Sequence, residues 1–334
     1  MRGKAPKGRR EIGGSVGRVT SAKTRLPVWL ALLGSGIAGA LVAVQSRING
    51  GLSNELGNGY VTAAVSFGSG LILIAAALLV SGRARAGLRR VRAEVRSGHL
   101  PRWALTGGLF GAFFVLSQGL IATTLGLALF AVGIVAGQVL GGLLIDRIGL
   151  GPGGRVGLTA QRLIGTALAI VAVAVSVYAD LAAPAGLTSQ IWLILVPVAV
   201  GAGVAFQSAV NGLVRSAAYS ATTATFVSFL VGAAVLIGAA AISVTTSGWP
   251  TVWPTEPWYY FGGVLGVIFI ALAALLVRTA GVLLLSMSNV AGQLLASVAV
   301  EAALPLAGGV TTVLLAATGV ALLAVVIAAI PSRR

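Results

Sequence analysis

Residues 42–51 read VAVQSRINGG, and residues 204–213 read VAFQSAVNGL. In both stretches a glutamine precedes an asparagine by four residues in strongly apolar surroundings, and the second stretch follows the first by 162 residues. Amides in such surroundings are costly unless they meet a partner or line a cavity. The pattern, written twice, predicts an internal duplication and makes the amides candidate functional residues.

The match continues well beyond these ten residues. VSFGSG from Val65 matches VSFLVG from Val227 at the same offset, and VAGQ ending at Gln138 matches VAGQ ending at Gln293 at an offset of 155. The offset changes by seven residues within the loop that we expect at about 81–102. A length difference confined to a loop is what a duplication predicts.

The composition predicts an all-α integral membrane protein. With 57% hydrophobic residues, 9% charged residues and a mean hydropathy of +1.00, the chain has too little polar surface for a soluble globule. Its apolar runs are continuous, which favours helices over strands, and a helix crosses the hydrocarbon core with about 20 residues. We expect ten transmembrane helices, at 27–47, 58–80, 103–122, 124–146, 161–180, 190–212, 221–244, 258–277, 279–302 and 305–330.

The formal charge of +16 does not point to a nucleic-acid partner, because the positions of the basic residues indicate a membrane topology. Given these spans, every Lys and Arg except Arg47 falls on the side that carries both termini, which the positive-inside rule makes cytoplasmic. Each copy contains five spans, an odd number, so the second copy enters the membrane from the opposite side. The cation-free, Trp-rich stretch at 249–260 then lies outside.

These boundaries divide the chain into five segments. We expect a basic flexible cytoplasmic arm at 1–26, a first five-helix repeat at 27–180, a linker at 181–189, a second five-helix repeat at 190–330 and a cytoplasmic tail at 331–334. The arm is interpreted as a topology determinant that can touch anionic lipid. Two inverted five-helix halves are the usual architecture of secondary transporters.

Enzymatic chemistry has little support in the sequence. There is no Cys, and the single histidine, His99, lies in a basic loop where a solvated side chain is the simplest interpretation. Nothing resembles a catalytic triad, a zinc site or a phosphate-binding glycine loop. We therefore expect no enzyme, no cofactor and no metal.

The residues also resemble a known family. A Gln-x-x-x-Asn pair, a following VSF helix, a Trp with two glycines shortly after it, a Gly-Gln pair and a late acidic residue are similar to the YdcZ-type exporters of the drug/metabolite transporter (DMT) superfamily. The resemblance covers about residues 28–330. It implies the EamA-like fold in a fused two-repeat form, in the bacterial inner membrane, carrying small metabolites or drugs outward.

Seven amides are candidates to line a cavity. Residues four apart share a helix face, so Gln45 with Asn49 and Gln207 with Asn211 each form one polar surface. Amides both donate and accept hydrogen bonds, which suits a polar substrate without charge selection. Interhelical hydrogen bonds that hold the halves together are an equally good interpretation. The same two interpretations apply to the remaining amides, which are Gln138, Asn289 and Gln293.

Three charged residues complete the candidate set. Asp146 and Glu301 each follow a repeat-related glutamine by eight residues and close the fourth helix of their half at opposite faces, so they could gate a cavity by taking up protons. Glu301 is the stronger candidate because no cation is near it in sequence, whereas Asp146 could be an interfacial residue beside Arg147. Arg47 could attract an anionic substrate, reach the outer surface or pair with Glu55.

The leading interpretation is a secondary transporter that exports a small solute, with proton exchange as the expected driving force. A passive channel and a non-transporting membrane scaffold are the alternatives. The expected partners are the small-molecule substrate, the lipid bilayer and protons. Small-residue helix faces would serve a homodimer or internal packing, and no nucleic acid is expected.

Overall fold

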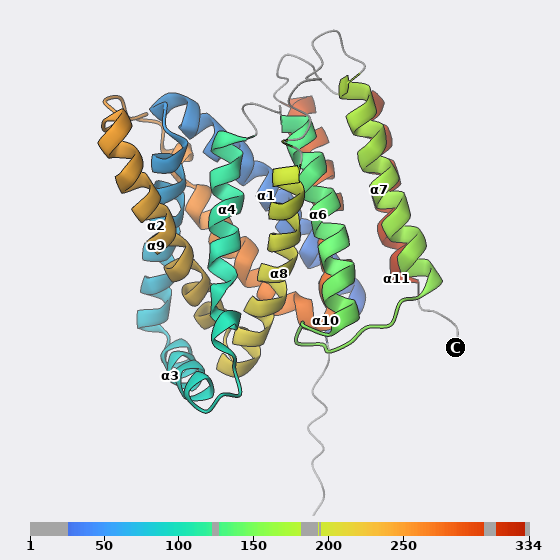
Figure 1. The fold of residues 1–334 in the computed structure, drawn as a ribbon, viewed down its shortest axis with the longest axis horizontal. Coiled ribbons are helices and arrows are strands. Elements are labelled where there is room, and N and C mark those ends of the chain that lie inside the picture. Colours follow the sequence, from blue (N-terminus) through green and yellow to red (C-terminus); the bar gives the residue numbers. More distant parts are fainter. Residues whose placement is uncertain (1–25, 122–126, 182–192, 194, 304–311, 331–334) are drawn as a thin grey trace, which may run out of the picture.

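The structure is a computed structural model, and it describes residues 26–121, 127–181, 193, 195–303 and 312–330. These residues form two short 3-10 helices, η1 (Arg102–Thr106) and η3 (Pro257–Tyr260), and a bundle of α-helices (Figure 1). The α-helices are α1 (Val28–Leu56), α2 (Gly59–Val80), α3 (Gly82–Arg96), α4 (Gly107–Leu120), α6 (Leu127–Ile148), α7 (Ala160–Leu181), α8 (Leu195–Ala218), α9 (Ala221–Ser247), α10 (Gly262–Ala303) and α11 (Thr312–Ala329).

The all-α expectation is confirmed by this bundle. By length and composition, five stretches within the described residues can cross a membrane: α1, α2, α8, α9 and residues 257–296, which include most of α10. The basic arm at 1–26, the linker at 181–189 and the tail at 331–334 fall almost wholly outside the described residues.

Two of the expected spans, 258–277 and 279–302, fall on η3 and α10. Helix α10 is interrupted at Gly281, whose φ of 77° and ψ of 171° are open to glycine and strained for other residues. The chain reverses direction there, so that the part of α10 before Gly281 and the part after it run along the bundle in opposite senses (Figure 1).

The loop expected at about 81–102 contains a helix instead. Ser81 begins α3 by accepting a hydrogen bond from the backbone N–H of Ala84, and Ala84, Gly87 and Val91 are buried on one face. The sequence carries this signal, because small or apolar residues recur at helical spacing between the arginines. The high density of arginine in this segment therefore does not indicate a loop.

The two expected halves are interlocked. α1 packs along α10, and its repeat counterpart α8 packs along α6. The remaining long pairings, α2 with α9 and α7 with α11, also join one half to the other (Figure 1). Most of the core therefore forms between the halves.

Glycines mark the closest approaches, and they do so at repeat-related positions. A Cβ at Gly39 would collide with the backbone of Asn289, and a Cβ at Gly201 would collide with the backbone of Ile134. Gly201 follows Gly39 by 162 residues and Asn289 follows Ile134 by 155, the two offsets seen in the sequence. The same helix crossing is thus made twice.

A second repeat-related contact lies at the centre of the core. The rings of Phe67 and Phe229, the phenylalanines of the two VSF segments, stack with centroids 4.9 Å apart. Phe67 lies against Gly232, and Phe229 lies against Gly70. The small residues of α2 and α9 therefore serve internal packing at these positions.

The basic and the Trp-rich segments occupy opposite ends of the bundle. α3, the segment 149–159 and the turn at Gly281 lie at the lower end in Figure 1, and the segment 248–261 lies at the upper end. Segment 149–159 and the turn are in contact, because Gly153 lies near the carbonyl of Arg278.

Candidate functional site

The first amide pair lies on the buried side of α1. Gln45 is 4% exposed and donates from Nε2 to the carbonyl of Gly262 at 3.0 Å. Asn49 is 3% exposed, yet neither its Oδ1 nor its Nδ2 has a hydrogen-bond partner among the described residues. The hydroxyl of Ser66 on α2 is likewise buried without a partner. A buried amide and hydroxyl left unsatisfied are unusual in a folded protein.

The second pair lies in the equivalent place on α8, and there both side-chain amide NH2 groups have a partner. Gln207 and Asn211 both donate to the hydroxyl of Ser228 on α9, each at 3.3 Å. Ser228 follows Ser66 by 162 residues, so the two serines are repeat partners. The two copies share their residues and differ in their hydrogen bonds.

Glycines give both pairs their space. A Cβ at Gly262 would meet Asn49 and Ser66, and one at Gly266 would meet Gln45. Gly107 and Gly111 on α4 stand in the same relation to Asn211 and Gln207. Each amide pair therefore faces a glycine surface from the other half, which places all four amides at the interface between the halves.

A third polar contact joins α6 to α10. Asn289 donates from Nδ2 to Oε1 of Gln138 at 3.0 Å, and both residues are 2% exposed. Oδ1 of Asn289 has no partner among the described residues. Gln293 is half-buried one turn further along α10. This contact also crosses between the halves, since Gln138 belongs to the first and Asn289 to the second.

Asp146 lies at the break in α10. Its carboxylate is 3% exposed and accepts from the backbone N–H groups of Val282 at 2.8 Å and Leu283 at 3.2 Å. It also forms an ion pair with Arg162 of α7. The carboxylate thus caps the helix segment that begins after Gly281, where backbone donors lack helical partners. Its cation is Arg162, while Arg147 points to the exposed surface.

The remaining charged candidates stand apart from these clusters. Arg47 is exposed and shares no face with Gln45 and Asn49, and no ion pair joins it to Glu55 within the described part of the chain. Glu301 belongs to the last turn of α10, but its side chain lies outside the described residues.

Sequence reasoning missed several participants. Ser66 and Ser228 lie within the repeated VSF segments, so the duplication itself was the signal that could have found them. Gln118 of α4, which donates to Ser46 of α1, has no amide in the second copy and gave no repeat signal. Arg162 is 8% exposed, and no local sequence pattern pairs it with Asp146.

Comparison with known proteins places this fold. The profile of a family described as "Putative inner membrane exporter, YdcZ", a DMT family, matches residues 30–175 and 192–330. The chain belongs to this family. The two matched segments fall within the halves expected from the sequence. They leave out the basic arm and the stretch between the halves.

YdcZ-family membership carries a coarse function with it. The family consists of inner-membrane exporters and not of enzymes, and its members cross the membrane several times. A solved structure described as "Crystal structure of protein" is similar at a TM-score of 0.62 with 18% identity, covering 90% of this chain and 96% of that one. At this identity the likeness shows the fold alone. No curated protein matches.

Proposed function

We propose that this YdcZ-family chain is a secondary transporter that exports a small polar solute by alternating access between two inverted five-helix halves. In this arrangement ten spans cross the bilayer, the break at Gly281 separates two of them, and both termini face the cytoplasm. The opposite placement of the basic and Trp-rich segments supports this topology.

The observation that carries the proposal is the set of matched contacts between the halves. Gly39 on Asn289 and Gly201 on Ile134 are the same crossing made by opposite halves. If the halves exchange conformations, each crossing takes up the geometry of the other, and an opening at one face becomes an opening at the opposite face. Matched crossings are therefore what a rocking mechanism needs.

The unpartnered groups of Asn49 and Ser66 support a place for the substrate. An amide oxygen, an amide N–H group and a hydroxyl can bind a neutral hydrogen-bonding group such as a hydroxyl, carbonyl or amide. The amides that already have partners, Gln45, Gln207, Asn211 and Gln138, then act as contacts that hold the interface. Asn289 and Gln293 extend the polar surface of α10.

Proton coupling is proposed for Glu301, with Asp146 second. Asp146 already has a cation and two backbone donors, so protonating it would cost those contacts. The residue 155 positions after Arg162 is Ala317, so the second copy lacks that cation in sequence. Transport by Glu301→Gln across a pH series tests this, with Asp146→Asn alongside. A pH profile identical to that of the native chain would remove Glu301 from the mechanism.

Transport itself is tested with purified protein in liposomes. Comparing metabolites in cells with and without the protein supplies the solute, and uptake is then followed with and without an imposed pH difference. Accumulation against the solute gradient supports a coupled carrier, downhill flux alone indicates a channel, and no flux of any enriched solute indicates a scaffold. Gly68→Ala serves as the control for variants tested in this assay and should transport like the native protein, because a Cβ at Gly68 meets nothing within 4 Å.

The topology is tested separately by cysteine labelling. The sequence has no native cysteine, so only an introduced cysteine can react. Single cysteines at Arg90 and Trp253 should react with impermeant reagents from opposite sides of the membrane. Labelling of both from the same side would contradict the inverted arrangement.

A further inference from the structure

The basic helix α3 is held firmly against the bundle. Thr223 donates from its hydroxyl to the carbonyl of Ala84 at 2.9 Å, and Val91 is buried among residues of α8 and α9. Arg90 donates to the carbonyl of Ala218 at 3.1 Å, and its guanidinium lies 5.5 Å from the ring centroid of Tyr219. The helix is therefore held in place, which fixes the face from which its other arginines extend.

Its neighbours place α3 at the edge of the hydrocarbon region. Leu79 and Val80, at the end of α2, are 66% and 85% exposed, and exposed apolar side chains of a membrane protein face acyl chains. Arginines begin three residues later, at Arg83. Tyr219 and Trp103, beside and just after α3, are 70% and 43% exposed, and aromatic rings of this kind mark the headgroup level.

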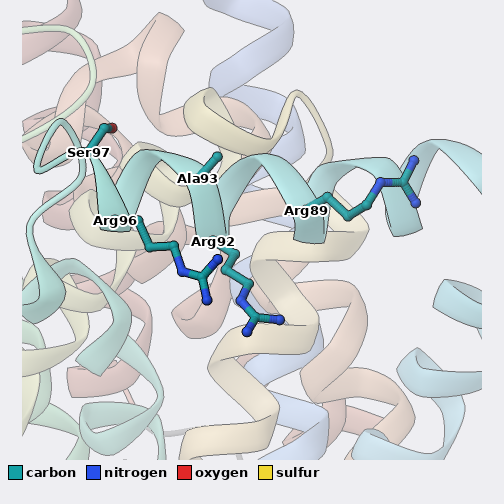
Figure 2. Close-up of a pocket in the computed structure, with 5 residues that line it drawn as sticks. All are labelled: Arg89, Arg92, Ala93, Arg96 and Ser97. Carbon is teal, nitrogen blue, oxygen red and sulfur yellow. The ribbon is translucent and has the colours of Figure 1, made fainter.

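Three arginines on this helix share one face. Arg89, Arg92 and Arg96 are spaced by three and four residues, which aligns them along one side of a helix. Together with Ala93 and Ser97 they line a shallow, open hollow on the surface of α3, where the side chains of Arg92 and Arg96 extend toward the same region and that of Arg89 extends further along the helix (Figure 2). Within the described part of the chain no hydrogen bond or ion pair engages any of the three guanidinium groups.

No acidic side chain among the described residues neutralises this face. Glu94, the acidic residue of α3, has its carboxylate 3.6 Å from the ring of His99 and is not among the residues that line the hollow. Arg85 is turned back to the carbonyl of Leu79. The corresponding stretch of the second half, at 248–256, contains no Lys or Arg. The cluster is therefore a feature that one half has and the other lacks.

We propose that Arg89, Arg92 and Arg96 form a binding site for the phosphate headgroup of an anionic phospholipid in the leaflet at this end of the bundle. Guanidinium groups bind phosphate oxygens in a bidentate manner, and three of them at headgroup depth match a phosphodiester with its acyl chains lying along α2. This site is separate from the transport path and does not depend on the proposed transport mechanism.

The test is native mass spectrometry of the full chain in detergent, titrated with phosphatidylglycerol or phosphatidylcholine. The native protein should retain phosphatidylglycerol at least tenfold more strongly. An arginine near an anionic lipid surface contributes about fivefold in affinity, so Arg89→Gln/Arg92→Gln/Arg96→Gln should lose of the order of a hundredfold at low salt. Equal retention of the two lipids by the native protein would overturn the proposal.

A matched control removes the same charge elsewhere at this end. Arg147, Arg155 and Arg278 are exposed, and replacing all three by Gln should leave phosphatidylglycerol retention within about twofold. An equal loss in this control would mean that net charge alone attracts the lipid. Displacement of the lipid by equimolar inorganic phosphate or a short oligonucleotide would assign the hollow to a soluble anion and also overturn the proposal.

Folding is checked by size-exclusion chromatography and melting in detergent. If the triple Gln variant does not fold, Arg92→Gln alone should lose about fivefold. The triple Lys variant should lose part of the affinity, because it keeps the charge and lacks the bidentate guanidinium geometry. A folded Arg92→Gln variant with unchanged lipid preference would count against the site.

Discussion

The surroundings of Asn49 and Asn211 are two copies of one arrangement with different outcomes. Each asparagine faces a glycine from the other half and stands near a repeat-related serine. Asn211 donates to its serine at 3.3 Å, whereas Asn49 and Ser66 are buried without partners among the described residues. The duplication reproduced the shape of the site, and the two copies then acquired different hydrogen bonds. In the proposed mechanism the second copy holds the structure together, and the first keeps groups available for a ligand.

The largest effect is expected where the copies should behave alike. Gly39→Val and Gly201→Val each push a side chain into the backbone of the facing helix, so each should destabilise the protein by about 3 kcal/mol or more. Melting in detergent measures this, with Gly68→Ala and Gly238→Ala as controls, since a Cβ at either position meets nothing within 4 Å. If only one of the two substitutions lowered the melting temperature, the two crossings would not be equivalent.

A second large effect is expected where the copies differ in charge. Asp146→Asn leaves Arg162 buried without its anion, which should cost about 3–5 kcal/mol of stability. The double variant Asp146→Asn/Arg162→Gln should recover part of that loss, because no unpaired charge remains. Thermal unfolding of the two single variants and the double variant measures the coupling. Additive losses would mean that the ion pair contributes nothing beyond its separate residues.

The smallest effect separates the two asparagines directly. Asn211→Ala removes a hydrogen bond between helices and should cost about 0.6–1 kcal/mol of stability. Asn49→Ala removes an unsatisfied buried amide, so stability should not fall, while transport should drop about tenfold through the lost contact with substrate. Melting and liposome flux are measured on both variants. Equal behaviour in the two assays would contradict the division of roles between the copies.

Much of this architecture could be predicted from the sequence, because a duplication places corresponding residues at a constant offset. The offsets 162 and 155 predicted which residues correspond, and the contacts of Gly39, Gly201, Phe67 and Phe229 follow them. The helical class followed from continuous apolar runs. The helix at α3 was missed because arginine density was interpreted as a loop, although its apolar residues recur at helical spacing.

The local chemistry was less legible, because it depends on which side chains meet across the interface. The spacing of four residues placed Gln45 and Asn49 on one face, yet nothing in the sequence showed that Gln45 would be bonded and that Asn49 would lack a partner among the described residues. The partner of Asp146 is 16 residues away on another helix, and the capped break at Gly281 is 135 residues away. Such long-range contacts are set by packing and not by local pattern.

The interlocked pairing of α1 with α10 and of α6 with α8 bears on how such a chain could have arisen. A polypeptide limited to either half would leave the long faces of its first and fourth spans uncovered, because their cover comes from the other half. Half-length ancestors with this geometry would have been viable only as intertwined pairs, and gene fusion would then have tethered two molecules that already depended on each other.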